Sequence, residues 1–226
     1  MLLIDADVVA HRSAYATLES DLDVTFEKID EIMDFLVGKN LFKPDKSLVR
    51  SFLSGKSNFR KDLDPEYKAN RKSSSKPDSL PDCMGYLIEE YGASVSEGQE
   101  ADDDIAIMAA SLDYKCTIAS IDKDFLQIPC RHFNFYHNHS SVVSEFEGLH
   151  FFYKQILTGD RADNVKGLYR VGEVKASKML DGCKTEEELF DVTLRAYEGD
   201  LEQVTLTGRL LWLRRKEGEL WEPPVR

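Results

Sequence analysis

Short apolar runs alternate with longer amphipathic stretches through the first part of the chain. Apolar positions recur at helical spacing in one stretch, at Phe26, Ile29, Ile32, Met33, Leu36 and Val37. Runs of apolar and β-branched residues predict strands at 1–4, 47–53, 93–96 and 115–121, and helical patterns are found at 8–20, 26–40, 79–91 and from 100 onward. Strands and helices in alternation favour an α/β domain with a mostly parallel central sheet.

The pattern changes after residue 125. Two further strands are predicted at 131–136 and 141–146, joined by His137-Asn138-His139, which we interpret as a polar turn. From there on the periodicity is helical, with helices predicted at 151–157, 185–197 and 201–213. The second of these begins with a capping box, Thr185-Glu186-Glu187-Glu188.

Carboxylates gather at the predicted ends of strands and at the start of one helix. Glu100-Ala101-Asp102-Asp103-Asp104 precedes an apolar run, where acidic residues complement the positive end of a helix. That interpretation alone requires no chemistry. Pairs of similar kind follow other predicted strands or turns, namely Asp5 and Asp7, Asp122 and Asp124, and Asp160 and Asp163. Open α/β sheets bind their ligands beyond the carboxyl ends of the strands.

The spacing of these acids would let them meet at one site. Side chains two apart on an extended segment face the same way, so Asp122 and Asp124 can enter one pocket. Asp160 and Asp163 stand at i and i+3 and project from one face of a turn. Clustered carboxylates cannot all stay ionised without cations, and such oxygen-rich pockets suit hard ions such as Mg²⁺. The acids therefore predict a metal site that handles phosphate.

Composition narrows the class of protein. The chain has 226 residues, of which 42% are hydrophobic, and it lacks an apolar run near 18 residues, which predicts a soluble protein without a membrane partner. It opens directly on a strand-like run without a basic leader. Its cysteines are scattered, at Cys83, Cys116, Cys130 and Cys183. We therefore expect a cytoplasmic protein with reduced thiols.

Charge at first argues against a nucleic-acid partner, because the net charge is −12 and phosphate binding needs Lys and Arg. Removing the eight proposed metal-site carboxylates from this total leaves −4. The remaining charge is uneven, since basic residues cluster at 60–76, 166–178 and 209–216. The local sign of the charge therefore matters more than its total.

The first basic cluster lies in a long segment poor in aliphatic residues, 58–72, which three serines follow. Loops of this length inside a compact domain are usually functional or disordered. Tyr67 beside Lys68 could stack on a base or clamp a phosphate. A solvated linker with incidental charge explains the composition equally well.

The segment reads NFRKDLDPEYKANRK and closely resembles the corresponding stretch of phage 5′→3′ exonucleases, members of the flap-endonuclease superfamily with a PIN-like α/β core. In that family the stretch forms a helical gateway, or arch, over the active site. The resemblance implies that Tyr67, Lys68 and Arg71 touch the scissile phosphate and the passing 5′ strand. It also implies DNA contacts for Arg60 and Lys72. A lysine or arginine aimed at a developing phosphorane charge suits transition-state stabilisation.

Three further motifs carry the same resemblance. Glu100-Ala101-Asp102-Asp103 matches EADD, Ser120-Ile121-Asp122-Lys123-Asp124 matches S/T-x-D-x-D, and 159–164 matches GDxxDN. By resemblance, one or two metal ions would be held by Asp5, Glu100, Asp102, Asp103, Asp122, Asp124, Asp160 and Asp163. The expected ion is Mg²⁺, for which Mn²⁺ can substitute.

The stretch KGLYRVGEVKASKML resembles the family's helix-three-turn-helix, whose backbone, often with a bound K⁺, grips the phosphates of duplex DNA. The DNA contacts implied by this resemblance are Lys166, Gly167, Gly172, Lys175 and Lys178. The two glycines would supply positive φ or a close backbone approach. The helix from Glu173 onward would point its N-terminus at phosphate.

Over the whole chain, the resemblance implies a PIN-like α/β core at 1–150 that includes the gateway at about 56–80, and a helical DNA-binding region at 151–226. The implied activity is that of a Mg²⁺-dependent 5′→3′ exonuclease with flap-endonuclease activity, using two-metal-ion catalysis. Its substrates would be duplex, 5′-ended or branched DNA, extending to the RNA of RNA:DNA hybrids. No obligate protein partner is evident from the sequence, and a phage-encoded enzyme would work in the host cytoplasm.

One departure and three alternatives stay open. Where the family often has another aspartate after the second strand, this chain reads Leu53-Ser54-Gly55-Lys56, which leaves one metal shell in doubt. Asp5-Ala6-Asp7 also fits haloacid-dehalogenase-like phosphatases, but Glu100 and Asp122 would then have no role. A PIN-type ribonuclease would share the acids without the duplex-gripping element. A catalytically silent DNA-binding protein would bind DNA without turnover.

Overall fold

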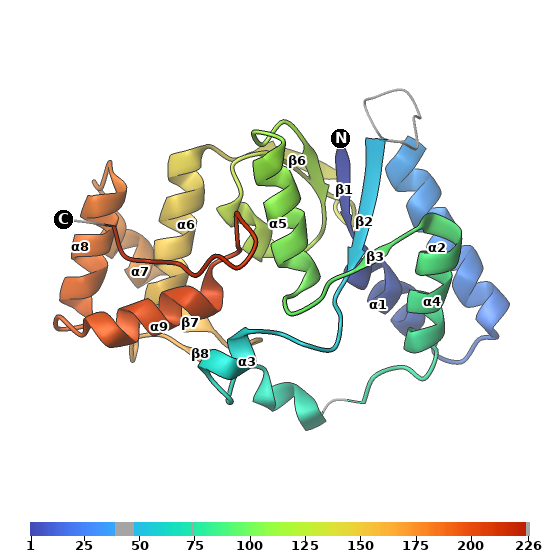
Figure 1. The fold of residues 1–226 in the computed structure, drawn as a ribbon, viewed down its shortest axis with the longest axis horizontal. Helices are drawn as coiled ribbons and strands as arrows, with labels where there is room; N and C mark the ends of the chain where they lie inside the picture. Colours follow the sequence, from blue (N-terminus) through green and yellow to red (C-terminus); the bar gives the residue numbers. More distant parts are fainter. Residues whose placement is uncertain (39–47, 74, 225–226) are drawn as a thin grey trace. The chain divides into compact units, whose positions relative to one another are not determined.

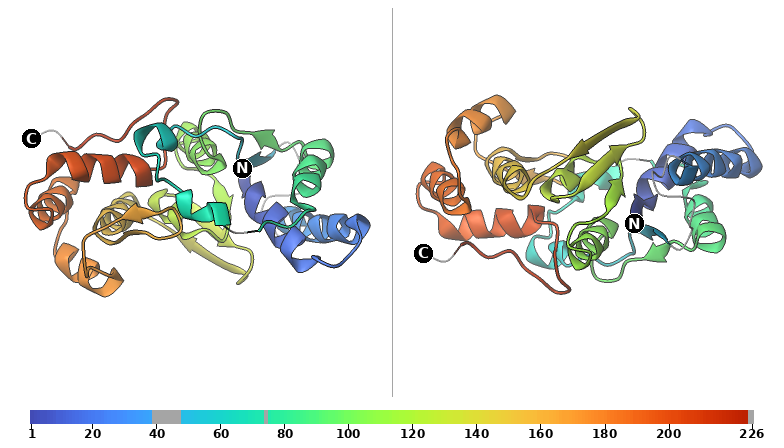
Figure 2. Two further views of the ribbon diagram at one scale, coloured as in Figure 1. Left: turned by 90° about the horizontal axis from the view of Figure 1, so that it is seen from below. Right: turned by 90° about the horizontal axis from the view of Figure 1, so that it is seen from above.

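The computed structural model describes residues 1–38, 48–73 and 75–224, except for the side chains of residues 72 and 73. The chain forms two compact units, which are described one at a time. The first unit comprises Met1–Ser57, Ser75–Phe125 and Cys130–Val142, and the second comprises Asn58–Ser74, Leu126–Pro129 and Val143–Arg226. Figures 1 and 2 show the helices and strands of both units.

A six-stranded sheet in the order β3-β2-β1-β4-β5-β6 forms the centre of the first unit. Its strands are β1 (Leu2–Asp5), β2 (Val49–Leu53), β3 (Ser94–Val95), β4 (Thr117–Ala119), β5 (Arg131–Asn134) and β6 (His139–Val142). Neighbouring strands are parallel except for β5 and β6. The carboxyl ends of β1 to β5 therefore lie along one edge of the sheet, and the predicted mostly parallel α/β class is confirmed.

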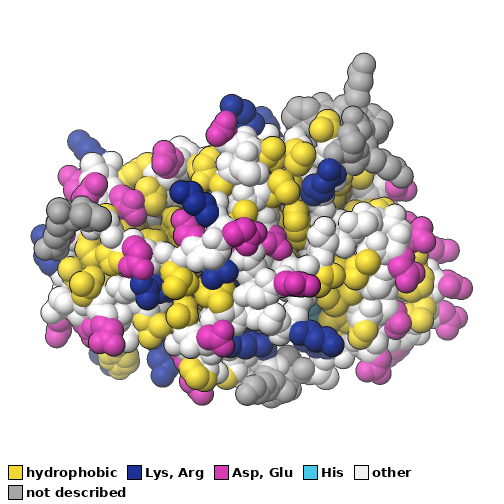
Figure 3. All heavy atoms as spheres, viewed as in Figure 1, with side chains coloured by type: hydrophobic (Ala, Val, Ile, Leu, Met, Phe, Trp, Pro, Cys, Tyr) yellow, Lys and Arg dark blue, Asp and Glu magenta, His cyan; other side chains and the backbone are white. Residues whose placement is uncertain are grey.

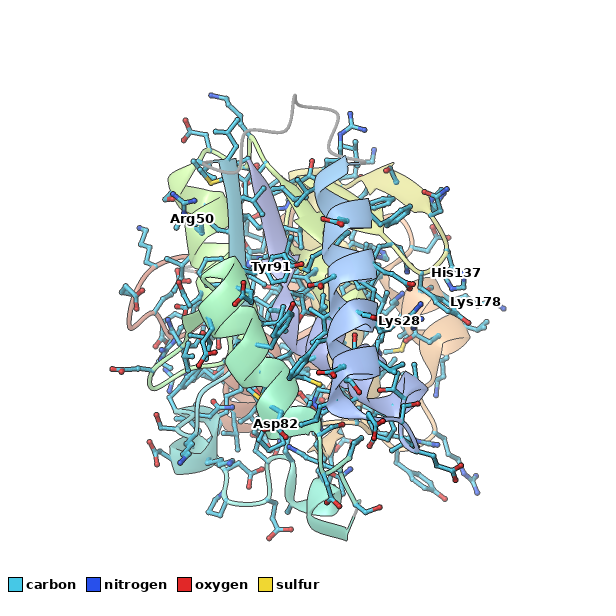
Figure 4. The ribbon with its side chains drawn as sticks, turned by 90° about the vertical axis from the view of Figure 1, so that its right-hand side faces the viewer. Lys28, Arg50, Asp82, Tyr91, His137 and Lys178 are labelled. Carbon is cyan, nitrogen blue, oxygen red and sulfur yellow. The ribbon has the colours of Figure 1, made fainter. Side chains whose placement is uncertain are left out.

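Helices cover both faces of this sheet. α1 (Ala6–Ala16), α2 (Leu22–Gly38) and α4 (Leu80–Tyr91) pack together on one face, and α5 (Ala101–Ser111) lies against β1 and β2 on the other (Figure 1). Figure 4 shows α2 and α4 side by side with Tyr91 between them, and the Tyr91 hydroxyl donates to Asp30 Oδ1 at 2.6 Å. The apolar core includes Leu2 and Ile4 of β1 and Leu87 of α4. This packing fixes the sheet edge from which the acids project.

The predicted elements are found close to their predicted boundaries, with one clear exception. Gly92 follows α4 at φ +63, a left-handed conformation that glycine adopts without strain. The predicted strand at 141–146 is wrong in its second half, because α6 (Glu145–Thr158) begins there. Ser144 Oγ accepts from Glu147 N at 3.3 Å and Glu147 Oε2 accepts from Ser144 N at 2.8 Å, a capping box that the strand pattern concealed. The predicted helix end at 39–40 lies outside the described residues.

The second unit is organised around α6, which contacts α7, α8 and α9. Its elements are the gateway's α3 (Arg60–Leu63) and 3₁₀ helix η2 (Ala69–Ser73), the hairpin β7 (Gly159–Asp160) and β8 (Val165–Lys166), and the helices α7 (Glu173–Leu180), α8 (Glu186–Ala196) and α9 (Leu201–Leu211). Aromatic side chains fill the core, with Phe152 of α6 edge-on to the rings of Trp212 and Trp221. A Cβ on Gly208 of α9 would lie 2.3 Å from the Trp221 ring, so only glycine lets the two meet.

The gateway segment was predicted within the nuclease core, yet 58–74 belongs to the second unit. The predicted domain boundary near residue 150 stays a prediction. Across the described parts of the chain, no helix has both the length and the apolarity needed to cross a bilayer.

Candidate active site

Asp5 stands at the carboxyl end of β1 and is the N-cap of α1. Its Oδ1 accepts from Val8 N at 3.1 Å, and its Oδ2 accepts from Ser120 Oγ at 2.6 Å. The side chain is buried because β1 runs between β2 and β4 in the sheet. The strand end and the cap together fix the carboxylate at the edge where ligands bind in such sheets.

The turn after β4 is organised by the same serine. Ser120 Oγ accepts from Asp122 N at 2.9 Å, and Asp122 Oδ1 accepts from Asp124 N at 2.9 Å. Asp124 lies in a 3₁₀ helix, η3 (Lys123–Gln127). Hydrogen bonds thus link Asp5, Ser120, Asp122 and Asp124 in one chain along the carboxyl edge of the sheet. The structure therefore places these three predicted acids along one edge of the sheet.

The acids of the third group begin α5, and their environments differ. Glu100, the N-cap, and Asp102 are partly exposed. Asp103 is fully buried, and its Oδ2 accepts from Glu100 N at 3.1 Å. Asp104 Oδ1 accepts from Gln99 Nε2 at 2.6 Å. The predicted metal role therefore fits Glu100 and Asp102, but it does not fit Asp103, whose carboxylate caps the helix instead.

The electrostatics of Asp5 test whether a cation fits this edge. The pKa of the Asp5 carboxyl is raised to about 7, chiefly by burial and also by the nearby charges of Asp7 and Asp122, while the hydrogen bonds from Ser120 and Val8 oppose the rise. A divalent cation would relieve this repulsion. Among the described residues, no three His, Cys, Asp or Glu side chains gather closely enough to hold an ion by themselves. An open carboxylate set of this kind suits an ion such as Mg²⁺, which keeps several of its waters.

The predicted phosphate-binding side chains of the gateway meet one predicted metal acid in the second unit. Asp163 Oδ2 accepts from the Tyr67 hydroxyl at 2.8 Å and lies 3.5 Å from Lys68 Nζ. Arg71 pairs with Asp163 Oδ1. Tyr67 is 3% exposed and its ring packs in the apolar core, so the predicted contact with a passing strand does not fit this position. Asp160, also buried, accepts from Ala162 N at 2.7 Å.

The predicted duplex-gripping element begins with the β7–β8 hairpin. A Cβ on Gly167 would lie 2.2 Å from Gly159 N, so the predicted close backbone approach is found there. Gly172 is different, because it caps α7 at φ −106 and a Cβ would meet no atom within 4 Å. The positive φ predicted for Gly172 is therefore wrong, and its close approach to a DNA phosphate stays a prediction. Lys166, Lys175 and Lys178 are all exposed.

Comparison with known proteins decides the family of this chain. The family described as "5'-3' exonuclease, N-terminal resolvase-like domain" matches residues 1–155. The chain belongs to this family. The match spans Asp5 and also the acids of α5 and of the turn after β4. A haloacid-dehalogenase-like phosphatase would leave these later acids without a role. We therefore set the phosphatase alternative aside.

Individual relatives are similar over most of this chain. A 5'-3' exonuclease of Mycoplasmopsis pulmonis is 27% identical over 213 residues, covering 84% of this chain and 69% of the relative. Flap endonuclease Xni of Colwellia psychrerythraea is 28% identical over 180 residues, covering 70% of this chain and 61% of the relative. A structure of T5 5'-exonuclease with bound zinc aligns with a TM-score of 0.69 and 16% identity, covering 93% of this chain and 88% of that one. The structural likeness confirms the predicted PIN-like fold.

After β2, where the family often has another aspartate, this chain has Ser54, and the serine makes contacts of its own. Ser54 N donates to Asp7 Oδ2 at 3.0 Å, and Ser54 Oγ accepts from Ala101 N at 3.0 Å. Ser54 thereby joins α1 to the start of α5 without adding a carboxylate. Sequence reasoning missed this linking role and that of Ser120, because Ala101 lies 47 positions from Ser54 and Asp5 lies 115 positions from Ser120.

Charge is distributed unevenly over the surface of the first unit. Acidic side chains gather over α2 and α4 (Figure 3), and the exposed acids of these two helices are Asp23, Glu27, Glu31, Asp34, Asp82, Glu89 and Glu90. This face repels phosphate, so much of the net charge of −12 stands away from the sheet edge that carries Asp5. His137 and His139 are exposed and belong to the β5–β6 hairpin. His137 lies in the predicted polar turn, and His139 is the first residue of β6.

Arg60 was predicted to bind DNA, and its position contradicts this. It is 1% exposed, its Nε donates to Leu210 O at 2.9 Å and its Nη2 donates to Trp212 O at 2.7 Å. The guanidinium therefore satisfies the last carbonyls of α9 and ties α3 to that helix. The side chain of Lys72, also predicted to bind DNA, lies outside the described residues.

Arg60→Met is expected to destabilise the protein by about 3 kcal/mol, because it leaves two buried carbonyls without their charged donor. Urea unfolding would measure this loss. Lys61→Met, at the exposed neighbouring position, is the matched control and should change stability by less than about 0.5 kcal/mol. Equal stability of the two variants would contradict the role assigned to Arg60.

The raised pKa of Asp5 predicts how the stability of the metal-free protein depends on pH. The folded pKa of about 7 lies above the ordinary value of 3.8, so between these values the folded state binds the extra proton. The contribution to stability is complete below the ordinary value and is lost as the pH rises through about 7. Urea unfolding in EDTA should show a loss of roughly 2–3 kcal/mol between pH 5 and pH 8. Equal losses in wild type and Asp5→Asn would contradict this assignment.

Proposed function

We propose that this member of the 5'-3' exonuclease family is a divalent-metal-dependent 5′→3′ exodeoxyribonuclease that also cleaves branched DNA as a flap endonuclease. The observation that carries the proposal is the buried Asp5 carboxylate at the sheet edge, linked through Ser120 to Asp122. A buried carboxylate that the charges of Asp7 and Asp122 repel, in a protein of this family, is best explained by a cation that it binds.

The acids of the first unit would hold the metal. Asp5, Asp122 and Asp124 share one hydrogen-bonded chain, and Glu100 and Asp102 stand at the start of α5. We expect Mg²⁺, with Mn²⁺ as a substitute, in one or two positions. When bound, the ion supplies a water of lowered pKa and neutralises the leaving oxygen. Structures of the T5 enzyme contain divalent ions, which supports metal binding here.

The chain's own residues orient and charge the site. Ser120 donates to Asp5 and fixes its carboxylate, leaving little freedom to lose when a ligand binds. In the second unit, Lys68 and Arg71 carry the positive charge that a phosphodiester would need. Exposed Lys166, Lys175 and Lys178 would contact the backbone of duplex DNA. Gly167 would let the backbone of the β7–β8 hairpin stay compact beside them.

Finer parts of the proposal concern ligands and substrates. A K⁺ ion at the turns before α7 would help to bind DNA phosphate, and the RNA strand of RNA:DNA hybrids would be a further substrate. Solved relatives include a T5 flap endonuclease complex with DNA and a Rad2 complex with DNA substrate, which supports DNA as the main ligand. Such an enzyme would act where the DNA is, in the cytoplasm, which would be the host's if a phage encodes it.

The deciding experiment follows product lengths over time from 5′- and 3′-labelled duplex and flap DNA. Reactions would contain Mg²⁺ or EDTA, with wild type, Asp124→Asn and the control Asp113→Asn, whose side chain is 84% exposed. We expect short 5′ products in Mg²⁺ for wild type and the control, and none in EDTA or with Asp124→Asn. Binding of DNA without cleavage in Mg²⁺ and Mn²⁺ would instead identify a catalytically silent DNA-binding protein.

A further inference from the structure

Asp163 differs from the other predicted metal acids because donors from the protein already occupy both of its carboxylate oxygens. Oδ2 accepts from the Tyr67 hydroxyl at 2.8 Å and lies 3.5 Å from Lys68 Nζ, and Oδ1 pairs with Arg71. Two of these three donors are cationic. The pair with Arg71 is a charge-assisted hydrogen bond, which is the stronger class, and Lys68 adds an ion pair, so the carboxylate is firmly held.

Backbone contacts dock the gateway onto the same loop. Lys68 N donates to Asp163 O at 2.8 Å, and Lys68 adopts φ +56, a conformation that non-glycine residues keep only where their surroundings hold it. Asn70 Nδ2 donates to Arg161 O at 2.9 Å, and Asn164 Nδ2 donates to Glu66 O at 2.8 Å. Residues 66–71 and 161–164 therefore form one surface within the second unit.

Asp160, the other acid of the pair, is held in a different way. Its Oδ1 accepts from Ala162 N at 2.7 Å and from Asp163 N at 3.3 Å, so it shapes the tip of the β7–β8 hairpin. A divalent ion at Asp163 would stand beside the positive charges of Lys68 and Arg71, which would repel it. The surroundings of Asp163 therefore do not fit a metal ligand.

We propose that Asp163 is a positioning residue, which holds Lys68 and Arg71 in place for the DNA phosphate and does not bind the metal. The inference rests on the proposed nuclease function, because positioning matters only if these side chains meet a phosphodiester. Tyr67 takes part in the same arrangement, since its buried ring anchors the gateway and its hydroxyl fixes the carboxylate. The side chains of lysine and arginine stabilise a transition state most effectively when they are already in position and need not move during the reaction.

The first test compares Asp163→Asn with Asp124→Asn in two assays that need no catalysis. Trypsin cleavage after Lys68 and Arg71, followed by mass spectrometry in EDTA, reports how firmly the gateway is docked. We expect Asp163→Asn to speed this cleavage roughly five-fold or more, with Asp124→Asn unchanged. Mn²⁺ binding, followed by electron paramagnetic resonance, should stay within about two-fold of wild type for Asp163→Asn and weaken about ten-fold or more for Asp124→Asn.

A charge-matched control is available on the gateway itself. Asp62→Asn, at an exposed position of α3, removes the same charge without touching Asp163 and should leave both assays unchanged. Weakened Mn²⁺ binding in Asp163→Asn at the level of Asp124→Asn, or a wild-type rate of trypsin cleavage, would overturn the proposal. Because neither assay needs turnover, both outcomes stay interpretable even if the protein proves to be a silent DNA-binding protein.

Kinetics separate positioning from a merely structural role. With flap DNA in saturating Mg²⁺, Asp163→Asn should lower kcat with little change in KM, since a positioned cation acts on the transition state. In an Arg71→Gln background the same substitution should have a much smaller effect, because the side chain that Asp163 positions is already lost. Additive effects of the two substitutions would contradict coupling through the Asp163–Arg71 pair.

Discussion

Asp5→Asn is expected to reduce DNA cleavage on the order of 10²–10³-fold while making the metal-free protein more stable. The amide is nearly isosteric with the carboxylate, and it can still accept from Val8 N and bond to Ser120 Oγ. Asn is also a good N-cap, so α1 keeps its start. What the substitution removes is a negative charge that burial, Asp7 and Asp122 all disfavour.

The size of the stabilisation follows from the pKa. At pH 8 the wild-type carboxylate is ionised in the fold at the cost of a pKa raised from 3.8 to about 7. Removing that cost should stabilise the metal-free variant by about 2–4 kcal/mol in urea unfolding with EDTA. Activity and stability then change in opposite directions. This is expected where carboxylates that bind a cation repel one another in the metal-free protein.

Added metal supplies the control. Mg²⁺ should raise the stability of wild type by mass action and should do so much less for Asp5→Asn. The exposed substitution Asp113→Asn should leave cleavage, stability and the Mg²⁺ response unchanged. If Asp5→Asn were destabilised, or if it cleaved DNA at the wild-type rate, Asp5 would not be the charged centre of the site.

The acids at the strand ends could be predicted because both features behind them are local. A buried apolar run shows where a strand ends, and Asp5 or Asp122 follows it within three residues in the sequence. Parallel order then brings the ends together without any knowledge of individual contacts. The resemblance of 58–72 to phage exonucleases added the activity, which periodicity alone could not give.

The role of each acid could not be predicted in the same way. Asp102 and Asp103 are neighbouring aspartates, and the sequence does not distinguish their roles. In the first turn of α5 they face different directions, so Asp103 is buried and Asp102 is partly exposed. Ser120 and Asp5 are separated by 115 positions, so their hydrogen bond leaves no local signal. The same holds for Arg60, whose acceptor at Leu210 lies 150 positions away and whose neighbours in the sequence suggest an exposed basic cluster.

Gly167→Ala is expected to damage the β7–β8 hairpin severely, whereas Gly172→Ala should be nearly neutral. A Cβ at 167 would lie 2.2 Å from Gly159 N and from Thr158 C, and 2.5 Å from Thr158 O. These are backbone atoms, which cannot rotate away as a flexible side chain can. Relief would need the hairpin strands to separate, at a cost of about 3 kcal/mol or more.

Gly172, the N-cap of α7, is the matched control within the predicted helix-three-turn-helix. Its φ of −106 suits any residue, and a Cβ there would meet nothing within 4 Å. Replacing an N-cap glycine by alanine costs roughly 0.5–1 kcal/mol, which the lower entropy of the unfolded chain largely offsets. Urea unfolding should therefore separate the two variants by at least about 2 kcal/mol.

Binding of duplex DNA in EDTA, measured by fluorescence anisotropy, extends the comparison from stability to function. Lys166 adjoins Gly167 in the hairpin, so a displaced backbone should move its charge and weaken binding in Gly167→Ala. Gly172→Ala should bind as wild type does, since α7 and its exposed Lys175 and Lys178 stay in place. Equal affinities for all three proteins would mean that the hairpin does not take part in holding the duplex, and that the exposed lysines of α7 carry the contact alone.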